Sequence, residues 1–169
     1  MVSKKIILIG DFSTGKTSLI RRFVDNQFSD TYLSTIGVKI SRKIIPLEDE
    51  TIQGLIWDIE GGTEKKPVNS TYVRGAHGCI IVADITRNDT IANLASYIEI
   101  VRDIAPSTPF ILALNKADRL NEEARQKMYQ VTLNFYKETA SSLYLTSAKT
   151  GEGVDEIFKE IAQSMIDKG

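Results

Sequence analysis

The sequence predicts an α/β fold, in which helices cover both faces of a mostly parallel six-stranded sheet with one antiparallel edge strand. Two observations support this prediction. Short runs of consecutive apolar residues, typical of strands buried on both faces, alternate with longer stretches whose apolar residues recur at helical spacing. The polar turn Glu48-Asp49-Glu50 joins two further strand patterns and indicates an antiparallel pair.

The strands are expected at intervals along the whole chain. The four apolar runs that predict parallel strands are Ile6 to Ile9, Cys79 to Ala83, Phe110 to Leu114 and Leu143 to Leu145. The antiparallel pair is expected at Val38 to Ile45 and Ile52 to Trp57 and supplies the edge strand. Cys79 lies inside an apolar run, so we expect a buried structural thiol.

Four amphipathic stretches predict the helices. The first helix begins near Lys16, and Asn121 before Glu122 and Glu123 predicts the capped, acidic N-terminus of another. The apolar stripes, which we expect to face the core, are Leu19, Ile20 and Phe23; Ile91, Leu94, Ala95, Ile98, Val101 and Ala105; Ala124, Met128, Val131 and Phe135; and Val154, Ile157, Phe158, Ile161 and Met165.

Length and composition limit the class of protein. The 169 residues, 42% of them hydrophobic, are enough for one well-buried core, and no linker divides them, so residues 1–169 are expected to form one domain. The 21 basic and 22 acidic residues are interspersed, which argues against a nucleic-acid partner. No apolar run suits a signal peptide or a transmembrane segment, so we expect a cytoplasmic protein.

The segment from Gly10 to Thr17 fits the phosphate-loop pattern GxxxxGK[ST] and lies between an apolar strand and an amphipathic helix. Its glycines allow backbone N–H groups to point inward, and the helix adds its positive dipole end. Lys16 would contact the terminal phosphates and Thr17 would ligate Mg2+. An ordinary glycine-rich turn is the alternative. The residues expected to bind nucleotide here are Asp11, Phe12, Ser13, Thr14, Gly15, Lys16, Thr17 and Ser18.

Ligands in such sheets bind at the carboxyl ends of the strands, and three further strand ends carry polar motifs. Asp58-Ile59-Glu60-Gly61 places a carboxylate three residues before a glycine. Asn115-Lys116-Ala117-Asp118 and Thr146-Ser147-Ala148-Lys149 follow the strands that begin at Phe110 and Leu143. The first of these two, NKxD downstream of a phosphate loop, is the more specific signal.

In this order and spacing, the motifs resemble the Ras superfamily of small GTPases over essentially the whole chain, and the Rab branch most. Trp57-Asp58 and Tyr72-Val73-Arg74-Gly75-Ala76 are similar to Rab segments, and Phe28, Tyr32 and Thr35-Ile36-Gly37 fall at the family's spacing. The resemblance implies a small-GTPase fold of the P-loop NTPase class, with GTP or GDP and Mg2+ as ligands.

The resemblance also implies selectivity for guanine. Asp118 would accept hydrogen bonds from the guanine ring, Asn115 would hold the loop and Lys116 would pack along the base, whereas adenine could not satisfy the carboxylate. Phe28 would stack edge-on to the base, with an anchor for the preceding helix as the alternative. The rest of the implied base site is Ser147, Ala148 and Lys149.

A nucleotide-dependent switch is a further implication. Thr35 would ligate Mg2+ only beside a γ-phosphate, Asp58 would hold the ion through a water, and Gly61 would donate its backbone N–H to the γ-phosphate. Tyr32 would close over the phosphates or remain a surface tyrosine. The implied catalytic residues are Lys16, Thr35 and Gly61, and the implied metal ligands are Thr17, Thr35 and Asp58.

Interaction with other proteins is implied as well. Ile40, Trp57 and Tyr72 match the exposed triad by which Rab proteins meet effectors, with simple sheet packing as the alternative. Lys65 to Pro67 replace a more apolar Rab sequence, so the resemblance does not imply that this chain binds Rab-type partners. No cysteine follows residue 79, so this chain carries no lipidation site; it is either truncated or not lipid-anchored.

The departures from the family fall on the hydrolytic machinery. Gly62 stands where the family usually has a water-orienting glutamine, and Glu60 stands where it has alanine. Phe12 and Ser13 replace small residues and would crowd water or an incoming arginine. The segment around Thr35, which the resemblance identifies as switch I, contains no arginine that could act in cis. Glu60 or Glu64 would either orient water or form a solvated surface.

Three functions follow from these motifs. The leading one is a switch that binds GTP and GDP and hydrolyses GTP slowly. The second is a pseudo-GTPase that stays GTP-bound and acts as a protein-interaction module. The third, another phosphate-loop enzyme such as a nucleoside kinase, is disfavoured by the NKxD and TSAK motifs.

Overall fold

The structure is a computed structural model that describes residues 1–24, 31–35, 37–140 and 142–168; for residues 31–35 it describes the backbone only. The strands are β1 (Val2–Gly10), β2 (Thr31–Thr35), β3 (Val38–Pro46), β4 (Thr51–Ile59), β5 (Gly78–Asp84), β6 (Phe110–Asn115) and β7 (Leu143–Leu145). The helices are α1 (Lys16–Val24), α2 (Asn88–Ala92), α3 (Leu94–Ile104), α4 (Glu122–Tyr136) and α5 (Val154–Asp167), with short 3-10 turns η1 (Ser70–Val73) and η2 (Ala117–Arg119).

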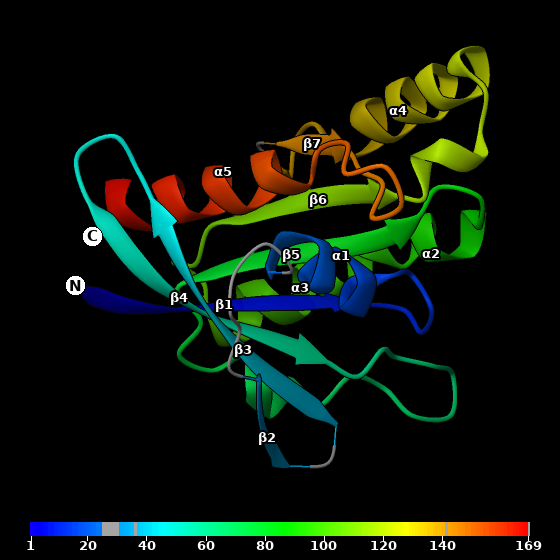
Figure 1. The fold of residues 1–169 in the computed structure, drawn as a ribbon. Coiled ribbons are helices and arrows are strands. Elements are labelled where there is room, and N and C mark those ends of the chain that lie inside the picture. Colours follow the sequence, from blue (N-terminus) through cyan, green and yellow to red (C-terminus); the bar gives the residue numbers. More distant parts are fainter. Residues whose placement is uncertain (25–30, 36, 141, 169) are drawn as a thin grey trace.

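The sheet has the order β2-β3-β4-β1-β5-β6-β7 among the described residues (Figure 1). All six predicted strands are present, and they pair in parallel except at β3, which runs antiparallel to β4. The sheet continues one strand further than predicted, because β2 pairs with the outer side of β3. The edge is therefore β2, whose sequence Thr-Tyr-Leu-Ser-Thr has no apolar run that would have signalled it.

Residues of the central strands alternate between two hydrophobic clusters, one on each face of the sheet. Ile6 and Leu8 of β1 pack with α1 and α5, whereas Ile7 and Ile9 pack with α3 and α4. This alternation follows from the two-residue period of a strand, and it explains why a buried parallel strand reads as a continuous apolar run. In Figure 1, α1 and α5 lie in front of the sheet and α3 lies behind it.

The helix predictions hold in part. The stripe of α5 is buried as expected, and Asn121 caps α4 by accepting a hydrogen bond from the backbone N–H of Ala124 at 2.8 Å. The predicted stripe of α4 is wrong at Val131 and Phe135, which are exposed, whereas Met128 packs against the core as predicted. The other residues of α4 that pack there are Tyr129, Thr132, Leu133 and Tyr136.

The helix predicted from Ile91 to Ala105 is divided. It begins earlier, at Asn88, and Asn93 separates α2 from α3. Cys79 is fully buried, as predicted, and burial raises the pKa of its thiol well above the ordinary value. No helix in the described ranges is long and apolar enough to cross a bilayer.

Candidate functional site

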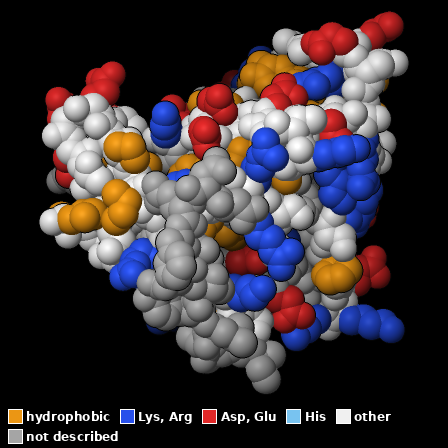
Figure 2. Space-filling model, viewed as in Figure 1, with side chains coloured by type: hydrophobic (Ala, Val, Ile, Leu, Met, Phe, Trp, Pro, Cys, Tyr) orange, Lys and Arg blue, Asp and Glu red, His pale blue; other side chains and the backbone are white. Residues whose placement is uncertain are grey.

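Two adjoining hollows lie at the carboxyl ends of the parallel strands. The larger, of about 930 Å³, is lined by the phosphate loop and by the segment that follows β4, including Asp58 and Gly61. The smaller, of about 500 Å³, is lined by Asn115, Asp118 and the segment that follows β7. The basic side chains around the smaller hollow are Arg21, Arg22, Lys116, Arg119 and Lys149. In Figure 2, Lys and Arg side chains gather on this face, over α1 and the strand ends.

Lys16 is folded back into the phosphate loop. Its side chain is 5% exposed, and its Nζ donates to the carbonyl oxygens of Asp11 at 2.9 Å and Gly10 at 3.4 Å. Burial lowers its pKa to about 8, although Asp58 and Asp11 oppose this and Arg87 adds to it. The ammonium is held by carbonyls that a phosphate oxygen could replace.

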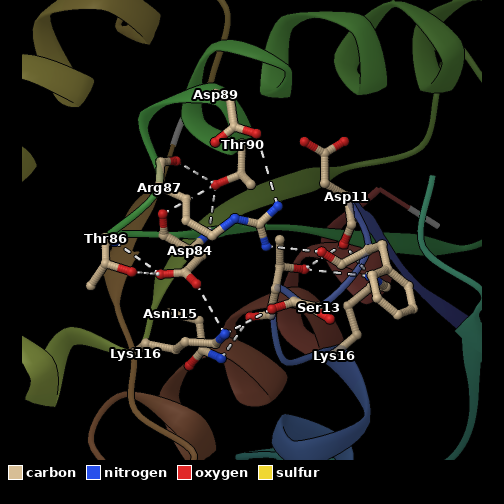
Figure 3. A network of polar contacts seen from close by, with 12 residues as sticks. Asp11, Ser13, Lys16, Asp84, Thr86, Arg87, Asp89, Thr90, Asn115 and Lys116 are labelled. Atoms are coloured by element: carbon tan, nitrogen blue, oxygen red, sulfur yellow. Dashed lines mark hydrogen bonds and ion pairs between the residues drawn. The ribbon is translucent and has the colours of Figure 1, made fainter. Parts of the chain in front are cut away.

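Side chains from distant strand ends fix the backbone of the phosphate loop. The Nδ2 atom of Asn115 donates to the Thr14 carbonyl at 3.0 Å, and Lys116 Nζ donates to the Ser13 carbonyl at 2.8 Å. Lys116 also forms an ion pair with buried Asp84, whose pKa stays below its usual range despite burial because Thr86 and Lys116 donate to it. Figure 3 shows these contacts converging on the loop.

The predicted base-binding residues meet at the smaller hollow. Asp118 accepts a hydrogen bond from the Ser147 hydroxyl through Oδ1 at 2.7 Å, and Ala148 and Lys149 line the same hollow. Asn115 is buried, and its Oδ1 accepts from the Thr146 hydroxyl at 3.0 Å. The NKxD and TSAK motifs, about 30 residues apart in sequence, are thus joined through two side-chain hydrogen bonds.

The predicted metal ligands are brought together as far as they are described. The hydroxyl of Thr17 donates to Oδ2 of Asp58 at 2.5 Å. Both side chains offer hard oxygen atoms, the kind of ligand that Mg2+ prefers. The side chains of Thr35 and Tyr32, in β2, and the whole of Phe28 lie outside the described residues.

The segment that follows β4 begins in contact with the phosphate loop. The backbone N–H of Gly62 donates to the Gly10 carbonyl at 3.1 Å, and the N–H of Phe12 donates to the Gly62 carbonyl at 3.0 Å. A Cβ atom on Gly61 would lie 2.5 Å from Cα of Phe12, so only glycine fits at that position. Phe12 lines the larger hollow and is 59% exposed.

Other predicted residues lie beside this segment. Glu60 is exposed and forms an ion pair with Lys66 at 3.3 Å. Ile40 and Trp57 are paired residues on β3 and β4, and the Trp57 ring lies 6.2 Å from that of Tyr72. The three apolar side chains pack against the core but stay partly exposed, so sheet packing and a docking surface are compatible.

The sequence reasoning missed one set of contacts around Asp11. Its carboxylate is directed toward α3 rather than into the hollow, where it accepts from the Tyr97 hydroxyl at 2.6 Å and from Asn93 Nδ2 at 2.8 Å. Burial and the Asp11 carboxylate raise the pKa of Tyr97 well above its ordinary value. Arg87, after β5, was missed as well and donates to the Phe12 carbonyl at 3.0 Å. Asp84 lies at the carboxyl end of a buried strand, so its carboxylate could have indicated that the loop after β5 also contributes to the site.

A strand, phosphate loop and helix at the edge of a parallel sheet, with an NKxD motif at a neighbouring strand end, define the phosphate-loop class of nucleotide-binding proteins. The model of the Ras family matches residues 5–167. The chain belongs to the Ras family, whose members are GTP-binding switches with GTPase activity.

Within the family the similarity is to Rab proteins. The chain is 37% identical over 162 residues to the Ras-related protein Rab-1C of Dictyostelium discoideum, covering 95% of this chain and 80% of that protein. It is 36% identical over 172 residues to the Ras-related protein Rab-1 of Theileria annulata, covering 97% and 74%. It is 34% identical over 169 residues to the GTP-binding protein ypt1 of Schizosaccharomyces pombe, covering 97% and 80%.

Proposed function

We propose that this protein is a switch that binds GTP and GDP with Mg2+ and hydrolyses GTP slowly, with residues 1–169 acting as one nucleotide-binding unit. The observation that carries the proposal is the meeting of the phosphate loop and three further strand-end motifs around two adjoining hollows. Gly15, Ser18, Lys116 and Arg119 line both hollows, so one ligand with a base and a polyphosphate can span them.

Guanine selectivity is proposed to depend on Asp118. Ser147 already donates to its Oδ1, which holds the carboxylate in place, and the two oxygens keep lone pairs that can accept from the ring N–H and the exocyclic amine of guanine. Adenine presents no such donor pair, and an unpaired buried carboxylate would cost a factor of about 10^4 or more in selectivity. Phe28, Ala148 and Lys149 are proposed to complete the base site.

Mg2+ is proposed to be held by Thr17, Thr35 and Asp58, the last through a water. The hydroxyl and carboxylate pair at Thr17 and Asp58 supports this assignment. When bound, the ion supplies positive charge to the phosphate oxygens. Loss of the γ-phosphate would release the contacts of Thr35, Tyr32 and Gly61, and this change in order is the proposed switch.

Slow hydrolysis is proposed because the described residues offer little to orient water. Gly62 has no side chain, and its backbone is bonded to the phosphate loop. The Glu60 carboxylate is paired with Lys66 at 3.3 Å, which favours the surface role over a role in water orientation. In this class of enzyme a positioned water and an arginine finger supply most of the rate, the finger about 10^3 to 10^5-fold.

Partners are proposed to bind through the switch segments and the half-exposed Ile40, Trp57 and Tyr72. Their close packing gives a partner a preformed apolar surface at the side of the sheet that carries β3 and β4. Action in the cytoplasm is proposed in keeping with the free, buried thiol of Cys79.

A competition titration tests the proposed function. GTP and ATP compete for the protein against a fluorescent GDP, with Asp118→Asn as the test variant and Asp103→Asn, an exposed position on α3, as the matched control. We expect GTP to compete far better than ATP, and Asp118→Asn to shift the preference toward xanthine nucleotides. Equal competition by ATP and GTP for the unmodified protein would reject the proposal.

A further inference from the structure

Three successive carbonyl groups of the phosphate loop are held by side chains from other segments of the chain. The Phe12 carbonyl accepts from Arg87 Nη1 at 3.0 Å, Ser13 from Lys116 Nζ at 2.8 Å, and Thr14 from Asn115 Nδ2 at 3.0 Å. Figure 3 shows Arg87, Asn115 and Lys116 directed toward the loop.

Each of these contacts determines where an N–H group points. The C=O of one residue and the N–H of the next belong to the same trans peptide unit and point in opposite directions. Holding the carbonyls of Phe12, Ser13 and Thr14 outward therefore turns the N–H groups of Ser13, Thr14 and Gly15 inward. In the described part of the chain, none of these three N–H groups donates to a protein acceptor. They form a concave set of donors of the kind that binds phosphate.

The peptide unit between Phe12 and Ser13, which Arg87 holds, precedes the most strained residue of the loop. Ser13 has φ of 63°, in the left-handed region that residues other than glycine rarely adopt. That conformation is what turns its N–H into the concave set, and it costs free energy in an isolated chain. A charged donor on the preceding carbonyl offsets part of this cost.

Arg87 is itself anchored at both ends. Its backbone N–H donates to the Asp84 carbonyl at 2.9 Å, and its carbonyl accepts from the Thr90 hydroxyl at 2.8 Å. At the other end, its Nη2 lies 3.9 Å from Oδ2 of Asp89. The planar guanidinium therefore donates to the loop while a carboxylate lies within ion-pair distance of its other side.

We propose that Arg87 is a positioning residue for phosphate binding, which holds the Phe12 carbonyl outward so that the Ser13 N–H faces the nucleotide phosphates. This inference rests on the proposed function, because it assigns a role at the same nucleotide site. It explains how a loop with Ser13, instead of a more permissive residue, keeps the conformation that phosphate binding requires. It also assigns Arg87 a role that is separate from recognition of the guanine base.

Binding measurements on three variants test the proposal. Arg87→Ala removes the donor, and Arg87→Lys keeps one at the end of a long side chain, as Lys116 does for Ser13. The matched control is Arg102→Ala, because Arg102 donates to the Thr139 carbonyl at the same 3.0 Å but contributes to neither hollow. The ligands are GDP, GTP and guanosine, the last of which has no phosphate.

We expect Arg87→Ala to weaken GDP and GTP binding about tenfold or more, since a hydrogen bond from a charged donor is lost. Binding of guanosine, followed by NMR titration, should change less than about twofold, and Arg87→Lys should recover most of the loss. In the GDP complex the Ser13 amide proton should move upfield in Arg87→Ala and stay in place in Arg102→Ala. A role in folding alone would not move that resonance selectively.

Unchanged GDP affinity in Arg87→Ala, an equal loss for guanosine, or an unmoved Ser13 amide would each overturn the inference while the proposed function stands. Failure of Arg87→Lys to recover affinity would also overturn it, since the donor would then not matter. If the unmodified protein bound no guanine nucleotide, the proposed function would fail, and this inference with it. The thermal midpoints of all variants, measured without nucleotide, identify any that do not fold.

Discussion

Replacing Gly62 by glutamine, the residue that the family usually has at this place, is expected to destabilise the protein. A Cβ atom on Gly62 would lie 2.5 Å from the hydroxyl oxygen of Tyr97 and 3.2 Å from Cγ2 of Val68. The Tyr97 hydroxyl donates to Oδ1 of Asp11 at 2.6 Å, and the residue is buried. The new side chain must therefore displace Tyr97 from the Asp11 carboxylate.

The expected change in the free energy of unfolding is the difference between two opposing effects. A lost hydrogen bond to a charged group costs about 1.5–3 kcal/mol. Gly62 does not have a left-handed φ, so replacing it restricts the unfolded chain and returns about 0.4–1 kcal/mol. The free energy of unfolding should fall by about 1–2 kcal/mol, which lowers the thermal midpoint by about 2–8 °C for a chain of this size.

A double-mutant cycle with Tyr97→Phe is the assay. Phenylalanine lacks the clashing oxygen and has already lost the hydrogen bond to Asp11, so Gly62→Gln should cost much less in that background. Urea unfolding of the four proteins should give a coupling energy of about 1 kcal/mol or more. Costs that add within about 0.5 kcal/mol would refute the clash as the reason that this chain has glycine here.

Three further outcomes are expected. Burial and nearby lysines lower the pKa of His77, the only histidine, so NMR titration should give a pKa below 6.5. Because the unfolded chain then binds the proton at higher pH than the folded protein does, the free energy of unfolding should fall as the pH drops below about 6.5. A measured pKa of 6.5 or more would contradict this prediction. Phe158→Ala, which removes a ring stacked 4.0 Å from that of Phe23, should cost about 3–5 kcal/mol in urea unfolding, and a cost under about 1 kcal/mol would disagree. Thr17→Ala should weaken both GDP and GTP, and Thr35→Ala mainly GTP, in nucleotide-release assays with and without Mg2+; equal effects of the two variants would reject their assigned roles.

Residues that belong to a recognisable motif were predictable, together with the strand ends at which the motifs meet, whereas long-range contacts of side chains outside any motif were not. The loop from Gly10 to Thr17 and the NKxD motif carry their chemistry in local order, so both were found. Tyr97 and Arg87 act on residues 86 and 75 positions away, and no local pattern links them to the phosphate loop.

The buried face of helix α4 was predicted wrongly in part, for a different reason. Two of its faces carry apolar residues, and the choice between them depends on tertiary contacts such as the hydrogen bond from the Tyr136 hydroxyl to the Ile91 carbonyl at 2.7 Å. Strand β2 is a polar edge strand that pairs through its backbone, so hydrophobic periodicity cannot detect it.

Single-turnover hydrolysis of GTP by the nucleotide-free protein in Mg2+ tests the proposed function most directly. We expect GTP to bind, ATP not to compete, and the bound GTP to be cleaved more slowly than by an otherwise similar GTPase that has the usual glutamine in place of Gly62. Glu60→Ala, run beside it, should leave the rate unchanged because that carboxylate is paired with Lys66. Complete absence of cleavage would instead indicate the pseudo-GTPase, and a brisk rate that is lost in Glu60→Ala would contradict the slow switch and make Glu60 catalytic.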